Sequence, residues 1–154
     1  MRRLFVGLDL LRATCSRESW LHFAREEAIR HPLCAKLHED PMVRRSFEKP
    51  RGYAGDAVLL DYLYGLRSRE YASPLGRLVA ELSAGRGPAA AVRHRRDLIA
   101  YRIDQLAERS RQSPRVLSVA CGHFREGACS IAVQNGALEE LVALDADAES
   151  LREV

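Results

Sequence analysis

Two short apolar segments separated by a helical pattern constrain the fold of this chain more than any other feature. The first, "RVLSV" at 115–119, is short and β-branched, and "LVALD" at 141–145 has the pattern of another buried strand. Between them, "REGACSIAVQNG" at 125–136 has the composition of a helix that stops at Gly136. A strand, a helix and a strand at this spacing predict a βαβ unit with parallel strands and a right-handed crossover.

The sequence upstream of this unit predicts helices only. Helical patterns cover 1–15, 16–31 and 88–110, shorter ones cover 42–47, 57–65 and 74–84, and Pro and Gly mark the breaks. Ser16, Asp56 and Ser73 stand where helix caps are expected. In the longest helix, Val92, Ile99, Ile103 and Leu106 fall in one stripe, and "RHRR" at 93–96 is expected to face solvent. We therefore expect an α/β protein with a helical region over 1–112 and a Rossmann-like domain beginning at 113–154.

Composition excludes several classes of protein. No segment approaches the ~18 apolar residues of a membrane helix, and charges at 9 and 12 interrupt the apolar run that a signal peptide would need. The 24 basic and 21 acidic residues are mixed along the chain, which gives specific nucleic-acid binding little support. The four cysteines form neither a C-x-x-C pair nor a metal-binding group, so we expect reduced thiols, a cytoplasmic location and no metal site.

The loop after the first strand and the end of the second strand form the candidate site. In a βαβ unit both lie at the carboxyl edge of the sheet, where α/β proteins bind ligands. Ala120 and Gly122 would let a ligand approach the backbone, and Asp145 could accept hydrogen bonds from two ribose hydroxyls. Alternatively, Gly122 only makes the turn and Asp145 caps a helix that starts near Ala148. An acidic residue about 20 positions after a glycine turn favours the ligand site.

The same loop is unsuited to a dinucleotide. A pyrophosphate needs an open glycine-rich turn and a helix N-terminus. Here His123 and Phe124 occupy the turn, and Glu126 would repel phosphate. The sequence therefore favours a nucleoside cofactor without phosphates.

These segments resemble a known family. "VLSVACGHF" followed by "LVALDADAESL" is similar to the first two cofactor-binding motifs of class I S-adenosylmethionine-dependent methyltransferases. Together with the upstream "KPRGYAGD", the chain from about 45 to 154 resembles the bacterial extracellular factor 3-hydroxypalmitic acid methyl ester biosynthesis proteins. The sequence departs from the common pattern of class I enzymes in two respects. Ser118 replaces an acidic residue in the first strand, and three glycines are reduced to Ala120, Gly122 and Phe124.

The resemblance implies S-adenosylmethionine as cofactor and assigns it a set of residues. Ala120, Cys121, Gly122 and His123 would lie beside its methionine part, Asp145 at the ribose hydroxyls and Ala146 near the adenine. Arg125 and Glu126 are expected to open the helix after the loop. There Arg125 is either solvated or paired with the cofactor carboxylate or an acidic acceptor.

The resemblance also implies an acceptor site in "GYAGD" at 52–56. Tyr53 and Asp56 would face a small or lipid-like acceptor, whereas the alternative is that Asp56 caps a helix and Tyr53 packs on the core. A fatty-acid-type carboxylate is already ionised near neutral pH, so we name no catalytic base.

The sheet predicted from this chain is incomplete. A class I methyltransferase sheet has seven strands, and two strands with open edges make a poor independent sheet. We expect a fragment of a longer enzyme, a truncated product, or a protein completed by a second copy or another chain. The alternative functions are a non-catalytic helical interaction module, an enzyme remnant and, with less support, a basic nucleic-acid binder.

Overall fold

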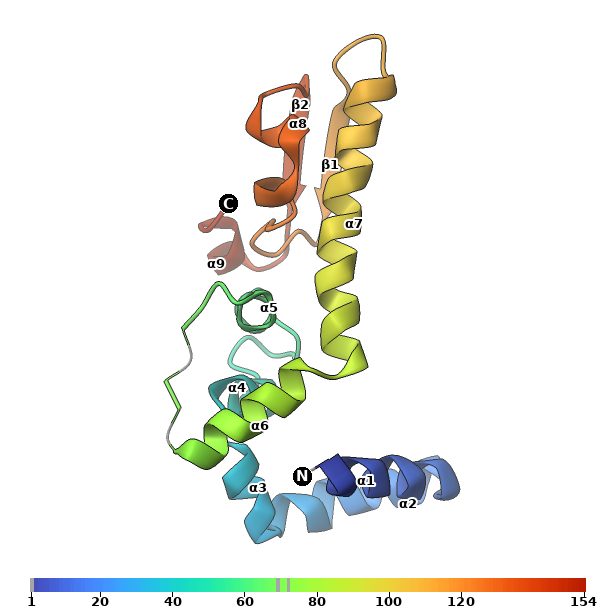
Figure 1. Cartoon of the computed structure of the whole chain (residues 1–154), viewed down its shortest axis with the longest axis vertical. Coiled ribbons are helices and arrows are strands. Elements are labelled where there is room, and N and C mark those ends of the chain that lie inside the picture. Colours follow the sequence, from blue (N-terminus) through green and yellow to red (C-terminus); the bar gives the residue numbers. More distant parts are fainter. Residues whose placement is uncertain (1, 69, 72) are drawn as a thin grey trace. The chain divides into compact units, whose positions relative to one another are not determined.

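The computed structural model describes residues 2–68, 70–71 and 73–154 as a mixed α/β protein that is mostly helical (Figure 1). Its strands form a small parallel sheet. The chain divides into two compact units. The first runs to Ala54 and includes Arg67–Arg86, and the second comprises Gly55–Leu66 and Gly87–Val154. The second unit thus extends upstream of residue 113, where we expected the α/β region to begin, because it includes two helices of the N-terminal region.

The first unit is helical throughout its secondary structure. Its elements are α1 (Arg2–Thr14), α2 (Arg17–His22), the π-helical η1 (Phe23–Glu27), the 3-10 turn η2 (Ala28–Arg30), α3 (Pro32–Leu37), α4 (Pro41–Glu48) and α6 (Pro74–Ala84). The helix predicted over 16–31 is therefore present as three successive helical segments, capped by Ser16 as expected. Met1 lies outside the described residues.

Close backbone contact joins α6 to the segment before α4. Ser73 caps α6 by accepting a hydrogen bond from the Gly76 amide (3.1 Å), and its hydroxyl donates to Glu39. That hydrogen bond, followed by the Lys36 ammonium, lowers the pKa of Glu39. A Cβ at position 76 would lie 2.6 Å from the Glu39 carbonyl oxygen. Gly76 is thus required for the approach of these two segments.

The second unit contains two helices from the helical region together with the βαβ segment. Its elements are α5 (Ala57–Tyr64), α7 (Gly87–Arg109), β1 (Arg115–Val119), the 3-10 turn η3 (Gly127–Cys129), α8 (Ile131–Gln134), β2 (Glu140–Leu144) and α9 (Ala148–Leu151). Within the described part of the chain, no helix combines the length and the apolar character needed to cross a membrane.

Small residues form the buried face of α7. Ala89, Ala100 and Ile103 are buried, whereas Ile99 and Leu106, which share the apolar stripe with Ile103, are 37% and 44% exposed. The alanines allow other elements to approach the helix closely, and large side chains flank this face.

Two arginines of α7 contact α5 instead of facing solvent. The Arg96 guanidinium lies 4.8 Å from the centre of the Tyr64 ring, and Arg93 donates to the Leu63 carbonyl (3.4 Å). The prediction that "RHRR" faces solvent is therefore wrong for these residues. Their long apolar stems can cover a neighbouring helix while the charged groups reach its surface.

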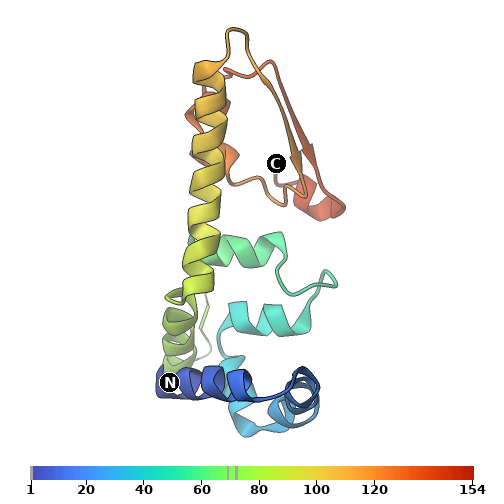
Figure 2. The ribbon, with the colours of Figure 1, turned by 90° about the vertical axis from the view of Figure 1, so that its right-hand side faces the viewer.

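The sheet has parallel register, with Arg115 opposite Glu140 and Val119 opposite Leu144. This confirms the predicted parallel strands, although β2 begins one residue earlier than expected. Figure 2 shows α7 and α8 on the same side of the strands. On that side a core of Ile103, Cys121, Phe124 and Ala132 packs against partly buried residues of β2. The other face carries four exposed apolar side chains: Leu117, Val119, Val142 and Leu144.

The helix between the strands is much shorter than the predicted 125–136. It begins at Ile131, after Ser130 caps it with a hydrogen bond to the Val133 amide (3.3 Å). The carboxylate of Asp104, from α7, accepts from the Ser130 hydroxyl (2.6 Å) and the Ala132 amide (2.9 Å). The helix begins later than predicted because these tertiary hydrogen bonds satisfy the polar groups of its first turn at 130–132. The expectation that Arg125 and Glu126 open it is wrong.

Candidate functional site

The loop between β1 and η3 has an unusual backbone. Ala120, Gly122 and Phe124 have φ values of 55°, 56° and 45°, respectively. These left-handed angles suit glycine, and they are unfavourable for a residue with a Cβ. The loop therefore has glycine-like backbone angles at three alternate positions, and glycine occupies one of them.

Gly122 and Asp145 are brought together at the carboxyl ends of the strands. The Gly122 amide donates to Asp145 Oδ2 (2.7 Å), and the Asp147 amide donates to Oδ1 of the same carboxylate (2.8 Å). Each carboxylate oxygen can accept more than one hydrogen bond, so Asp145 keeps acceptor capacity for a ligand. Ala146, the expected adenine neighbour, is exposed beside it.

The helix-capping role that we considered as an alternative for Asp145 belongs to Asp147. Asp147 caps α9 through the Glu149 amide (3.0 Å) and also accepts from the Ser150 hydroxyl (2.8 Å). Asp145 lies two residues before the cap and accepts a hydrogen bond from Gly122 in the loop. Its expected contact with ribose hydroxyls stays a prediction.

Asp61 of α5 lies at the centre of a buried polar cluster that we did not predict. Its carboxylate is 2.8 Å from His123 Nδ1 and accepts two hydrogen bonds from Arg125, Nε to Oδ1 and Nη2 to Oδ2, both 2.8 Å. The Asp61 and His123 side chains are each 1% exposed. Helix α5 is thereby tied to the loop that follows β1.

The electrostatics of the cluster favour an ionised Asp61. Burial alone would raise the pKa of this carboxyl, but hydrogen bonds from Arg125 and His123 reverse the effect, and its pKa is lowered. Asp61 in turn raises the pKa of Arg125. A buried carboxylate is stable only when it is paired and hydrogen-bonded in this way.

Arg125 is held on one side by Asp61. Its Nη2 is also 3.4 Å from Glu153, and its side chain is 26% exposed. Among the described residues, Nη1 donates no hydrogen bond. Arg125 is thus neither fully solvated nor in a helical turn, and pairing of Nη1 with a cofactor carboxylate stays a prediction.

Cys121 is a buried member of the loop. Burial raises the pKa of its thiol, and the charge of Asp145 acts in the same direction. Since the thiolate is the reactive form, this thiol is suited to packing. All four cysteines are free, and Cys121 alone among them is buried.

Asp56 caps α5, which confirms one of the two roles that we considered for it. Its carboxylate accepts from the Leu59 amide (2.9 Å) and is almost fully buried. Tyr53 is 47% exposed and belongs to the first unit, whereas Asp56 belongs to the second. Contact of either residue with an acceptor stays a prediction.

One signal in the sequence could have identified Asp61. In "AVLLDYLY" it is the only charged residue of a helix whose other residues are apolar or aromatic, and such a residue must find a partner when the helix is buried. Its partners follow it by more than 60 positions, so their identity could not be predicted from local sequence.

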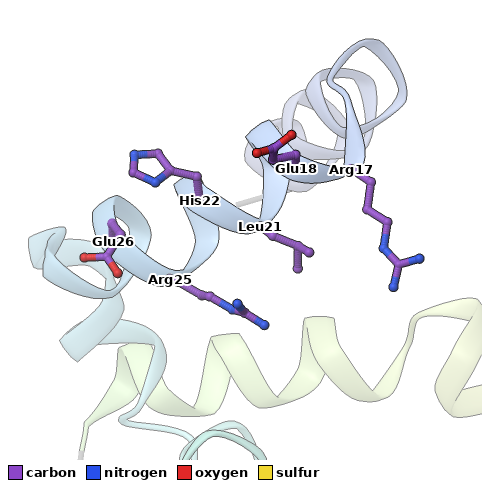
Figure 3. Close-up of a pocket in the computed structure, with 6 residues that line it drawn as sticks. All are labelled: Arg17, Glu18, Leu21, His22, Arg25 and Glu26. Carbon is purple, nitrogen blue, oxygen red and sulfur yellow. The ribbon is translucent and has the colours of Figure 1, made fainter.

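A surface hollow in the first unit lies along one side of α2 and η1 (Figure 3). Six residues line it: Arg17, Glu18, Leu21, His22, Arg25 and Glu26. In Figure 3, Glu18 and His22 point away from Leu21 and Arg25. Of the lining charges, Glu26 pairs with Arg30 (3.0 Å) at the surface. These exposed side chains do not converge on a common point, so we place the candidate site in the second unit.

Comparison with family models, curated proteins and solved structures finds no match to this chain. Its function must therefore be inferred from the geometry of the site and from the resemblance of its motifs.

Proposed function

We propose that the second unit carries the first half of the S-adenosylmethionine site of a class I methyltransferase. The observation that carries this proposal is the 2.7 Å hydrogen bond from the Gly122 amide to Asp145. It brings the loop after β1 and the acid after β2 to one edge of a parallel sheet. This is where α/β folds bind nucleoside cofactors.

The loop geometry supports a cofactor of this kind. Three left-handed residues at 120, 122 and 124 follow the spacing of the glycine motif. No α-helix begins between 120 and 130, so the loop lacks the helix N-terminus that a pyrophosphate requires. A phosphate-free nucleoside with ribose hydroxyls matches the acceptor capacity of Asp145.

In this proposal Asp145 binds the ribose, Ala146 lies near the adenine, and the loop 120–123 together with Arg125 holds the methionine part. The cofactor supplies a methyl group from a positively charged sulfur. The acceptor is an oxygen nucleophile on a small or lipid-like molecule, which in the resembled family is a fatty-acid-type carboxylate. Strands from additional sequence of the same chain, from a second copy or from a partner protein would complete the sheet.

Calorimetric titration with S-adenosylhomocysteine tests the proposal. We expect binding by the wild-type chain and a loss of about 10- to 100-fold in affinity for Asp145→Ala, since hydrogen bonds to a charged acceptor contribute about 1.5–3 kcal/mol. Glu140→Ala is the matched control, because it removes an exposed acid from the opposite end of β2. Absence of binding by the wild-type chain, or equal affinity in Asp145→Ala, would contradict the proposal.

A non-catalytic interaction module is the second candidate. The observation that favours it is the exposed apolar face formed by Leu117, Val119, Val142 and Leu144. Parallel sheets are normally covered on both faces. This candidate predicts self-association without affinity for S-adenosylhomocysteine, which sedimentation velocity and the same titration would distinguish.

A further inference from the structure

The polar cluster around Asp61 contains a buried nitrogen without a partner. His123 Nδ1 contacts Asp61, but Nε2 has no hydrogen-bond partner among the described residues, and the ring is 1% exposed. Leaving a buried polar atom unpaired costs about 1–3 kcal/mol. Such atoms in a folded chain call for an explanation, and one explanation is a functional role.

The partners of the ring fix its tautomer. Asp61 accepts from Arg125 through both oxygens, and its lowered pKa keeps it ionised, so it has no proton to donate. The 2.8 Å contact must therefore be donated by His123 Nδ1. In a neutral ring, Nε2 then carries the lone pair.

Arg125 lies against the same carboxylate as the ring. It donates two hydrogen bonds to Asp61, and its Nη2 is 3.4 Å from Glu153 and 3.5 Å from His123 Nδ1.

We propose that His123 Nε2 is the proton acceptor for a hydroxyl-bearing methyl acceptor, with Asp61 and Arg125 as positioning residues. This inference rests on the proposed function. An aspartate on Nδ1 and an Nε2 without a hydrogen-bond partner form the arrangement in which a histidine acts as general base. The buried ring becomes satisfied when an acceptor hydroxyl donates to it.

With S-adenosylmethionine bound, the acceptor O–H bond would break, its proton would form the Nε2–H bond, and the oxygen electron pair would bond to the methyl carbon that the cofactor supplies. The electron pair of the carbon–sulfur bond would stay on sulfur and cancel its positive charge. After the product has left, the proton would pass from Nε2 to the water that takes its place.

This step narrows the class of acceptor. A carboxylate is ionised at neutral pH and has no proton for Nε2 to accept. A hydroxyl group needs such a base. The cluster therefore favours an alcohol over the carboxylate implied by the resemblance.

Long-range ¹H–¹⁵N spectra of the histidine rings test the tautomer directly. In the wild-type chain we expect His123 to be protonated at Nδ1 and unprotonated at Nε2, with His123→Gln used to assign the signals. In Asp61→Asn the amide can donate to Nδ1, so the proton is expected to move to Nε2. The control Asp97→Asn removes an exposed carboxylate from an arginine pair of α7 and should leave the spectrum unchanged.

A wild-type ring protonated at Nε2 would overturn the proposal, and this result does not depend on whether Asp61→Asn folds. The acceptor class is tested by adding 1-octanol or octanoate to the chain with S-adenosylhomocysteine. Octanol should shift the Nε2 signal through its hydroxyl, and octanoate should not. A shift with octanoate alone, or with neither probe, would overturn the proposal. If S-adenosylhomocysteine does not bind, the proposed function fails, and the ligand-free spectrum still decides the tautomer separately.

Discussion

At the scale of single residues, the loop 120–124 combines side chains with backbone angles that they rarely adopt. Ala120 and Phe124 both have positive φ, and Phe124 is also part of the core of the second unit. Left-handed backbone costs about 1–2 kcal/mol for a residue with a Cβ. Packing of Phe124 and the hydrogen bond between Gly122 and Asp145 oppose this cost and keep the loop in place.

Replacing Ala120 with glycine should stabilise the second unit. The exposed methyl group contributes little packing, so Ala120→Gly should raise the free energy of unfolding by up to about 1 kcal/mol. Urea denaturation measures this change. Ala128→Gly is the control, because Ala128 lies in η3 and does not have a positive φ. This substitution should lower the free energy of unfolding by about 0.5–1 kcal/mol. Equal losses in both variants would show that the backbone of residue 120 is not strained.

At the scale of elements, tertiary hydrogen bonds decide where α8 begins. Asp104 of α7 accepts from Ser130 and from the Ala132 amide, and Ser130 is fully buried. The Ala132 amide, followed by the Ser130 hydroxyl, lowers the pKa of Asp104. A carboxylate on one helix thus specifies the start of another.

Removing Asp104 should destabilise the chain in a pH-dependent manner. Asp104→Ala should lower the free energy of unfolding by about 1–3 kcal/mol at neutral pH, since it leaves buried donors unpaired. Because the folded pKa lies below the ordinary value of 3.8, the contribution of Asp104 is present above that value and is lost as pH falls through the folded pKa. The difference from wild type should therefore shrink in acid.

Urea denaturation from neutral to acidic pH measures this dependence. Asp97→Ala is the matched control, since Asp97 lies on the same helix and its side chain is 57% exposed. A pH-independent loss in Asp104→Ala, or an equal loss in the control, would contradict the assigned role of Asp104.

At the scale of the whole molecule, one face of the sheet is apolar and exposed. Leu117 lies opposite Val142, and Val119 lies opposite Leu144, so the four exposed side chains form one contiguous patch. Isolated apolar residues on a surface are ordinary, but contiguous patches promote association.

Polar substitution of this patch should therefore reduce association. The double variant Val119→Thr/Leu144→Thr places β-branched side chains at both strand positions. It should bind less of a hydrophobic dye and associate at higher concentration than wild type. Dye fluorescence and sedimentation velocity measure these changes. Leu66→Thr is the control, because Leu66 is 56% exposed and lies outside the strands. An equal effect of the control would show that the patch has no special role.

Local sequence was sufficient to predict most helices and strands. Proline, glycine and capping residues stop and start helices through interactions within a few positions, so α5 and α6 could be predicted closely from Asp56 and Ser73. A short helix was also expected at 42–47, where α4 lies. Apolar β-branched segments and the spacing between them were sufficient for two parallel strands. The small residues and the acid that form the candidate site could also be identified, because both follow a predicted strand.

The remaining features depend on contacts between distant residues. The sequence by itself determined the strands, the turn at Gly122 and the position of Asp145, since these depend on local backbone preferences. The tertiary structure decided that α8 starts only after Ser130, that Arg93 and Arg96 pack on α5, and that Asp61 joins His123 to Arg125. The physical reason is that a buried charged group is stable only when it is paired. The fold brings its partners near, and they come from other elements of the chain.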